Sequence, residues 1–187
     1  ARKISFIKQY AVFNAEQIEG IEIPKPEPLN KDGFQPIERA ASIVSKWTDC
    51  PEIHHGNKHA SYVPARDIIT MPRPGSFESS EMYYSALFHE MGHATSHAKR
   101  LNRETGRAFG SKQYALEELV AEMTSAFLCA EVGIVNTVVD NQAAYLHGWI
   151  KALKGDAKLV VKAASQAQKA ANMILEHQPE DINKQVA

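Results

Sequence analysis

Hydrophobic residues in the second half of the chain recur every three or four positions, which is the spacing of one face of an α-helix. Serine, aspartate and asparagine stand where helix N-caps are expected, and Gly133 and Gly155 stand where helices should end. Together these signals predict four helices, over residues 79–98, 112–132, 140–155 and 156–177. The first is expected to begin at Ser79 or Ser80.

The first half of the chain alternates between extended and helical patterns. Residues 4–14 are rich in β-branched and aromatic side chains and predict a strand, and the proline-rich stretch 24–33 predicts a surface connection. A helix is predicted from Pro36 to about Thr48. Its buried face should carry four residues, namely Ile37, Ala40, Val44 and Trp47.

Short apolar pieces between residues 52 and 71, broken by glycine and proline, predict a small sheet, most simply an antiparallel one. Pro64 and Pro72 are expected at strand ends or on an edge strand, since proline cannot donate to a sheet. The fold class predicted from these elements is α+β, mostly helical with a small antiparallel or mixed sheet.

Length and composition narrow the class of protein. The chain has 187 residues, enough for one domain, with 44% hydrophobic and 23% charged residues, as in ordinary globular proteins. Lys+Arg number 21 against 22 Asp+Glu, so no overall charge favours nucleic acid. No apolar run predicts a membrane span, and two cysteines without a disulfide framework are typical of the cytoplasm.

The stretch FHEMGHATSH contains two histidines four residues apart, with a glutamate directly after the first. Residues four apart on a helix differ by about 40° around the axis and about 6 Å along it, so His89 and His93 can reach one cation. Glu90 would stand beside that cation, where a base can take a proton from a water molecule. The predicted apolar flank of this helix, which includes Leu87 and Phe88, favours a metal site over incidental histidines.

A third ligand is expected from another helix. His97 lies about 12 Å along the same helix from His89, which is too far for a shared cation with ligand distances of about 2 Å. Glu118 and Glu122 are four apart on the helix at 112–132, and the small Ala121 and Ser125 would allow close helix packing. We favour Glu118 as ligand and Glu122 as hydrogen-bond partner of a ligand histidine, and the reverse assignment stays open.

Alternatives remain for the other polar residues. Glu117 has fewer apolar neighbours than Glu118 and is the better candidate for a solvated position. Tyr62, Asp67, Ile69 and His97 are candidates to line a substrate cleft, although Ile69 is more simply a sheet-packing residue and His97 a histidine at a helix end. An oxyanion-stabilising residue cannot be singled out from five candidates, which are Tyr62, His97, Arg100, Arg103 and Tyr114.

His-Glu-x-x-His followed by a helix with a glutamate ligand resembles the gluzincin zinc metallopeptidases. A closer resemblance, to the C-terminal zincin-like domain of ArdC-type antirestriction proteins, is carried in order by YVPARDIITMP, FESSEMYYSALFHEMGHATSH, RLNR and FGSKQYALEELVAEMTSAFLCAEVGI. These bacterial proteins are encoded on mobile genetic elements, and related domains occur in plasmid primase-like proteins. The resemblance implies a zincin-like domain over 35–187, with 1–34 as a remnant of the linker from a domain associated with single-stranded DNA.

Two main functions follow from the resemblance and the motif. One is a zinc peptidase acting on a peptide or protein, with Glu90 as general base and manganese, cobalt or nickel as alternative metals. The other is a non-proteolytic binding protein that keeps the metal and contacts single-stranded DNA or a restriction enzyme through the full-length protein. A metal that only fastens two helices together is a third reading. Lysines at 151, 154, 158, 162 and 169 are candidate phosphate contacts or simply a solvated face.

Overall fold

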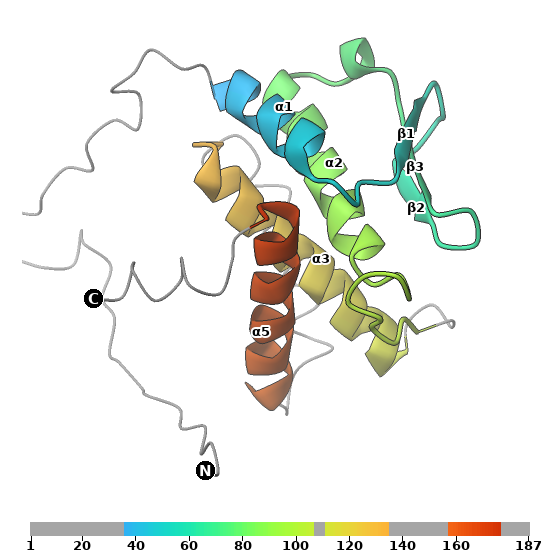
Figure 1. Ribbon diagram of the computed structural model, residues 1–187, viewed down its shortest axis with the longest axis vertical. Helices are drawn as coiled ribbons and strands as arrows, with labels where there is room; N and C mark the ends of the chain where they lie inside the picture. The colour runs from blue at the N-terminus through green and yellow to red at the C-terminus, as the bar shows by residue number, and fades with distance from the viewer. Residues whose placement is uncertain (1–35, 107–110, 135–156, 177–187) are drawn as a thin grey trace, which may run out of the picture. The chain divides into compact units, whose positions relative to one another are not determined.

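The computed structural model describes residues 36–106, 111–134 and 157–176 (Figure 1). The strand predicted at 4–14, the connection at 24–33 and the helix predicted at 140–155 lie outside these residues. Within the described residues the fold is α+β, with helices accompanied by one small sheet, as the sequence predicts.

Helix α1, Pro36–Lys46, contributes one edge of the core. Ala40 and Trp47 are buried, and Val44 is partly buried against the same cluster, as predicted. Ile37 is 38% exposed, so its predicted place on the buried face is wrong. The buried apolar side chains of this helix begin one turn later, at Ala40.

The sheet has three strands, β1 (Glu52–His55), β2 (Ser61–Val63) and β3 (Ile68–Met71), in the order β1-β3-β2. β2 pairs antiparallel with β3, whereas β1 pairs parallel with it, so the sheet is mixed and the simpler antiparallel expectation is wrong for β1. The chain crosses from β1 to the far edge before it turns back through β3, which brings β1 and β3 into the same direction.

The hairpin between β2 and β3 makes β2 an edge strand that lies against helix α2. Pro64 directly follows β2, and Pro72 directly follows β3, at the strand ends that the sequence predicts. Asp67 closes the hairpin in the left-handed region, with φ 51°, a conformation that aspartate tolerates better than most residues. Ile69, in the central strand, is fully buried and packs in the core.

Helix α2, Ser80–Ala94, follows a short 3-10 turn at Pro74–Ser76 and carries the His-Glu-x-x-His motif. Its N-cap is Ser79, whose side-chain oxygen accepts a hydrogen bond from the backbone N–H of Met82. Leu87, Phe88 and Met91 are buried on one side of the helix, as predicted.

Helix α2 ends at Ala94, four residues earlier than predicted. The hydroxyl of Thr95 donates a hydrogen bond to the carbonyl of Gly92 at 2.6 Å, and such side-chain bonds compete with helix continuation. The following residues fold back in a compact turn, in which the Leu101 N–H donates to the Thr95 carbonyl and Asn102 is left-handed with φ 46°.

Helix α3, Lys112–Glu131, begins at the N-cap Ser111 and is followed by Gly133, which has a positive φ of 79°, close to the predicted bounds. Helix α5, Ala157–Ile174, packs against α3 through a small apolar cluster. The buried members of this cluster are Leu116, Leu119, Val120, Ala163 and Ala167. None of the helices in the described ranges is both long enough and apolar enough to span a bilayer.

Helices α2 and α3 pack antiparallel at very short range (Figure 1). A Cβ built on Gly92 would lie 3.0 Å from the Ala121 Cα and 3.2 Å from the Thr124 Cβ. On α3, one turn after Ala121, the hydroxyl of Ser125 donates a hydrogen bond of 2.9 Å to the backbone carbonyl of Ser85 on α2. The predicted role of Ala121 and Ser125 in close helix packing therefore agrees with the structure, and Gly92 supplies the matching gap on α2.

Candidate metal centre

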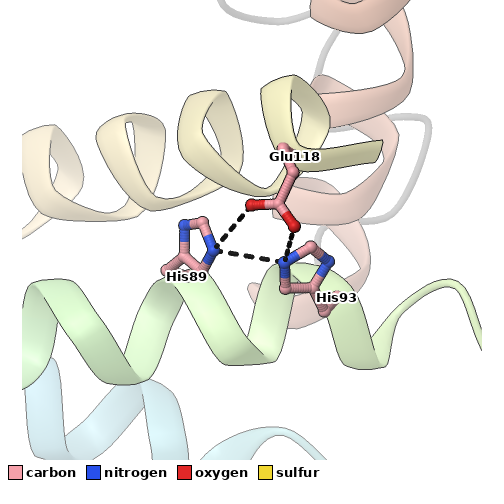
Figure 2. A group of neighbouring side chains, drawn as sticks. All are labelled: His89, His93 and Glu118. Atoms are coloured by element: carbon pink, nitrogen blue, oxygen red, sulfur yellow. Dashed lines mark hydrogen bonds and ion pairs between the residues drawn. The ribbon is translucent and has the colours of Figure 1, made fainter. Parts of the chain in front are cut away.

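Three donor groups from two helices converge in the structure (Figure 2). His89 and His93 project from α2, and Glu118 reaches them from α3. The two imidazole Nε2 atoms are 3.1 Å apart, and each lies 3.7 Å from a different oxygen of the Glu118 carboxylate. The sequence-predicted set of two histidines and Glu118 is thus brought together at one point.

These distances match the spacing of donors around a small divalent ion. Two ligands on a tetrahedral ion with bonds of about 2.1 Å are about 3.4 Å apart. The separations of 3.1, 3.7 and 3.7 Å bracket that value, and the donors are two imidazole nitrogens and one carboxylate, whose two oxygens each lie near one of the nitrogens. One donor atom from each residue lies within 4.8 Å of the other two, so the three side chains fit a metal of the zinc class in kind and in nearness.

A carboxylate stands behind each histidine. The Nδ1 atom of His89 is 3.5 Å from Glu122 Oε1, and the Nδ1 atom of His93 is 3.4 Å from Glu117 Oε1. Each ring thereby directs Nδ1 to a carboxylate and Nε2 to the centre, the orientation that outer carboxylates impose on metal-binding histidines. Glu122 lies where the sequence analysis expects it.

Glu117 differs from the expectation that it is solvated. It is only 6% exposed, because the Arg103 guanidinium binds both of its oxygens, with Nη2 at 2.7 Å and Nε at 3.0 Å. Arg103 comes from the turn after α2, fourteen residues away in sequence, and no local pattern around Glu117 reveals this partner. The prediction is wrong because a charge from another element occupies the space that water was expected to fill.

The charges around the site favour a cation at its centre. Burial lowers the pKa of His93, but hydrogen bonds to Glu117 and Glu118 and the nearby Glu90 outweigh this effect and raise it to about 10. Burial likewise raises the pKa of Glu118, but hydrogen bonds from His93 and Tyr114 bring it below its usual value. This arrangement of carboxylates stabilises positive charge where the two Nε2 atoms meet.

Glu90 is buried beside the histidines and is held by the edge strand. Its Oε2 accepts a hydrogen bond of 2.7 Å from the backbone N–H of Tyr62, which points away from β3. The strand that forms one wall of the site thus fixes the carboxylate that the motif assigns to proton transfer.

A cavity of about 420 Å³ opens over these groups. Strand β2 contributes one wall, and the residues before and within the first turns of α3 contribute the other. Its lining residues are Ala60, Ser61, Tyr62, Pro64, His89, Glu90, His93, Ser96, Thr105, Gly106, Tyr114, Glu117 and Glu118. The three donors and Glu90 therefore face space that a substrate can enter.

Other predicted cleft residues lie elsewhere. Asp67 does not line the cavity, because its carboxylate is held by Arg100 at 2.8 and 3.1 Å and by the Tyr62 hydroxyl at 2.9 Å. His97 lies in the turn after α2, with Nδ1 4.0 Å from Asp67 Oδ2, well removed from the donor group. Ile69 packs in the core.

Of the five candidate oxyanion-stabilising residues, two line the cavity. These are Tyr62 and Tyr114, whereas His97, Arg100 and Arg103 are not among its lining residues. Burial and a hydrogen bond to Glu118 raise the pKa of Tyr114 to about 12, and burial and Asp67 do the same for Tyr62. Both hydroxyls keep their protons at neutral pH.

Three features of the site were missed by sequence reasoning. They are the buried Glu117, the glycine at position 92 and the Tyr62 backbone N–H. A glycine between the motif glutamate and the second histidine is a readable signal of close helix packing. The other two depend on contacts between residues far apart in sequence, and no spacing rule supplies them.

The sequence is similar to parts of longer known proteins. The sequence is 38% identical over 173 residues to the DNA primase TraC of Escherichia coli, covering 92% of this chain and 12% of the primase. It is 35% identical over 172 residues to protein y4eC of Sinorhizobium fredii, covering 92% of this chain and 54% of that protein. The chain therefore spans only part of each of these relatives.

A solved structure shares both sequence and fold. The Mn(II)-bound crystal structure of the antirestriction protein ArdC from plasmid R388 is 37% identical, with a TM-score of 0.62, covering 89% of this chain and 61% of that one. The family model described as a zincin-like metallopeptidase, MPTase-PolyVal, matches residues 38–166. The chain belongs to this zincin-like metallopeptidase family, and its fold is similar to that of the matched part of the ArdC antirestriction protein.

Proposed function

We propose that this chain is the metal-dependent peptidase domain of an antirestriction protein, hydrolysing a peptide bond in a peptide or protein substrate. His89, His93 and Glu118 would hold the ion, with Glu90 as general base. The observation that supports this best is the convergence of three donor atoms at a cavity that also contains a buried carboxylate. Three protein ligands leave room for a substrate atom, as in catalytic rather than structural zinc sites.

When bound, the divalent ion would polarise the substrate carbonyl and increase the acidity of a nearby water. Glu90 accepts the proton from that water and delivers it to the leaving amine. The Tyr62 backbone N–H keeps Glu90 aimed into the cavity during both transfers. Tyr114 keeps its proton at neutral pH, hydrogen-bonds the Glu118 carboxylate and lines the cavity beside the donor group.

The identity of the metal is part of the proposal. Two imidazoles and one carboxylate are a zinc-type set, but manganese, cobalt and nickel accept the same donors. The ArdC structure from plasmid R388 carries Mn(II), which supports manganese as the first alternative for this chain. Metal analysis of the purified protein decides between them.

The cleft geometry favours an extended substrate. β2 is an edge strand, and Tyr62 presents its backbone to the cavity rather than to β3. An extended peptide can lie along such an edge and place its scissile carbonyl above the donor group. Asp67 and His97 would support this wall from behind, through the hydrogen bond from Tyr62 to Asp67, rather than contact substrate.

Glu90→Gln is the direct test. The amide keeps the shape of the side chain but cannot accept the proton, so cleavage of a generic protein substrate should fall about 10²–10⁴-fold. Glu78→Gln, an exposed glutamate just before the same helix, is the matched control and should leave the rate unchanged. Equal cleavage by the wild type and Glu90→Gln would remove Glu90 from the mechanism.

A second candidate function is metal-retaining binding without proteolysis. The names of the relatives, a DNA primase and an antirestriction protein, favour contact with single-stranded DNA or a restriction enzyme, made through the full-length protein. Lys158, Lys162 and Lys169 are exposed on α5, while Lys151 and Lys154 lie outside the described residues. Antirestriction activity that survives both Glu90→Gln and a chelator would favour this function. Absence of single-stranded DNA binding at low salt would remove its DNA-binding version.

We also propose bounds for the domain. We place the peptidase domain at 35–187 and assign residues 1–34 to the connection from a preceding domain. The partial coverage of every relative described above supports a longer natural protein. A bacterial cytoplasmic location is proposed with it.

A further inference from the structure

We infer that Arg103 and Glu117 act together as a positioning pair for His93, and that Arg103 keeps the Glu117 carboxylate from becoming an additional metal ligand. The inference rests on the metal site proposed above. It assigns a role to two buried residues that neither bind the ion nor contact a substrate in the proposed mechanism.

Glu117 stands on the outer side of the His93 ring. Its Oε1 is 3.4 Å from Nδ1, so the proton of the neutral ring belongs on Nδ1 and the lone pair on Nε2. That Nε2 atom faces Glu118 and His89 (Figure 2). Glu117 thus selects the nitrogen that His93 offers to the ion.

Glu117 is also among the residues that line the cavity, as are His93 and Glu118. An unrestrained carboxylate at this place, adjacent in sequence to Glu118, has the chemistry of a fourth ligand. A fourth protein ligand would close the position that catalysis requires. Another group must therefore keep the Glu117 carboxylate beside His93 Nδ1 and away from the ion.

Arg103 meets that requirement through a rigid set of contacts. Its Nε and Nη2 bind the two Glu117 oxygens at 3.0 and 2.7 Å, a bidentate arrangement that fixes the carboxylate plane. Its remaining hydrogen bonds go to the Gly92 carbonyl at 3.0 Å and the Thr95 hydroxyl at 2.6 Å, both at the end of α2. Arg103 therefore ties Glu117 to the helix that carries His93.

The geometry of these contacts makes lysine a poor replacement. A lysine keeps the charge but is a point donor on a flexible stem, so it cannot hold both oxygens of Glu117 in one plane. Arg103→Lys would then leave Glu117 free to rotate towards the ion. Glu117→Gln would keep the volume but remove the charge that pairs with Arg103 and attracts the His93 proton.

The test uses Co²⁺ as the probe, added to the whole chain after removal of endogenous metal. Affinity is measured by titration calorimetry, and coordination number is read from the intensity of the visible Co²⁺ absorption. We expect Glu117→Gln to weaken Co²⁺ binding about 10–100-fold. For Arg103→Lys we expect a Co²⁺ absorption spectrum that differs from that of the wild type, because the Glu117 carboxylate enters the set of ligands.

Arg100→Lys is the matched control, since Arg100 is equally buried in the same turn but binds Asp67 on the sheet side. It should change neither the affinity nor the spectrum. Wild-type affinity and spectrum in both Glu117→Gln and Arg103→Lys would overturn the inference. If Arg103→Lys fails to fold, as judged by thermal unfolding, Glu117→Gln alone decides through its affinity.

The outcomes separate this inference from the proposed function. A wild-type chain that binds no Co²⁺ would overturn both the metal site and the positioning pair. A wild-type chain that binds Co²⁺ but cleaves no substrate, while the two variants behave as expected, would support the pair and count against the peptidase.

Discussion

Two arginines leave the turn after α2 in opposite directions, and both are almost fully buried. Arg100 turns to the sheet side, where it binds the Asp67 carboxylate, the carbonyls of Asp49 and Ala94, and the face of Trp47 at 5.5 Å. Arg103 turns to α3, where it binds Glu117. The two side chains begin three residues apart and serve different halves of the domain.

The difference lies in what stands behind each carboxylate. The Asp67 carboxylate accepts a hydrogen bond from the hydroxyl of Tyr62, which belongs to the strand that forms a cavity wall. The Glu117 carboxylate contacts the ring of His93, which is one of the three donor groups. Similar ion pairs therefore support the scaffold on one side and the proposed metal site on the other, and burial alone does not distinguish the two roles.

The sharpest way to test this difference is Arg103→Met. It leaves Glu117 as a buried carboxylate without its cation, which typically costs about 3–5 kcal/mol of folding free energy. We expect this loss in urea unfolding of the metal-free protein, together with a changed Co²⁺ absorption spectrum because Glu117 is no longer held by Arg103. A loss under about 1 kcal/mol would mean that water or another group replaces the guanidinium.

Arg100→Met should have a smaller effect. The Asp67 side chain is 20% exposed, so water can hydrate the carboxylate once the guanidinium is removed. The lost hydrogen bonds and the contact with Trp47 should still cost about 1–3 kcal/mol in the same unfolding experiment. Metal affinity should stay at the wild-type value, and a large drop would show that the two sides are not separate.

The smallest expected effect is a pH dependence on the Arg100 side. Burial raises the pKa of Asp67, but the hydrogen bonds from Arg100 and Tyr62 outweigh burial and bring it below its ordinary value of 3.8. Because the folded-state pKa is the lower one, this stabilisation is present above pH 3.8 and is lost as the pH falls through the folded-state value.

Asp67→Asn removes this titration and serves as the comparison protein. The difference in unfolding free energy between it and the wild type should shrink as the pH falls from roughly 6 to roughly 3. Urea unfolding at several pH values measures it. A difference that is independent of pH would mean that the Arg100 pair contributes through packing rather than charge.

The sequence predicts the parts of the molecule that depend on local periodicity. The capped start of α2, the bounds of α3 and the facing of His89 and His93 all follow from helix geometry and cap chemistry. These features need no knowledge of the tertiary arrangement. Glu118 does converge with the two histidines, but His97 lies in the turn after α2, so the rise along one helix that the sequence argument used does not apply to it.

The missed parts depend on contacts between distant elements. The parallel pairing of β1 follows from the path of the chain across the sheet, which alternation of side chains does not encode. The burial of Glu117 depends on Arg103, and the early end of α2 depends on a turn that gathers Thr95 and Arg103 around one carbonyl. Exposed Ile37 reflects where the contact with the core begins rather than the helical pattern.

The short approach between α2 and α3 at Gly92 has a consequence for design. The distance between the two helix backbones at Gly92 determines how closely the Glu118 carboxylate on α3 approaches the imidazoles of His89 and His93 on α2. A Cβ at position 92 would lie 3.0 Å from the Ala121 Cα, so the two backbones would have to move apart by a few tenths of an ångström. Transplanting the proposed site into another scaffold therefore requires the close helix approach at this glycine, in addition to the donor residues.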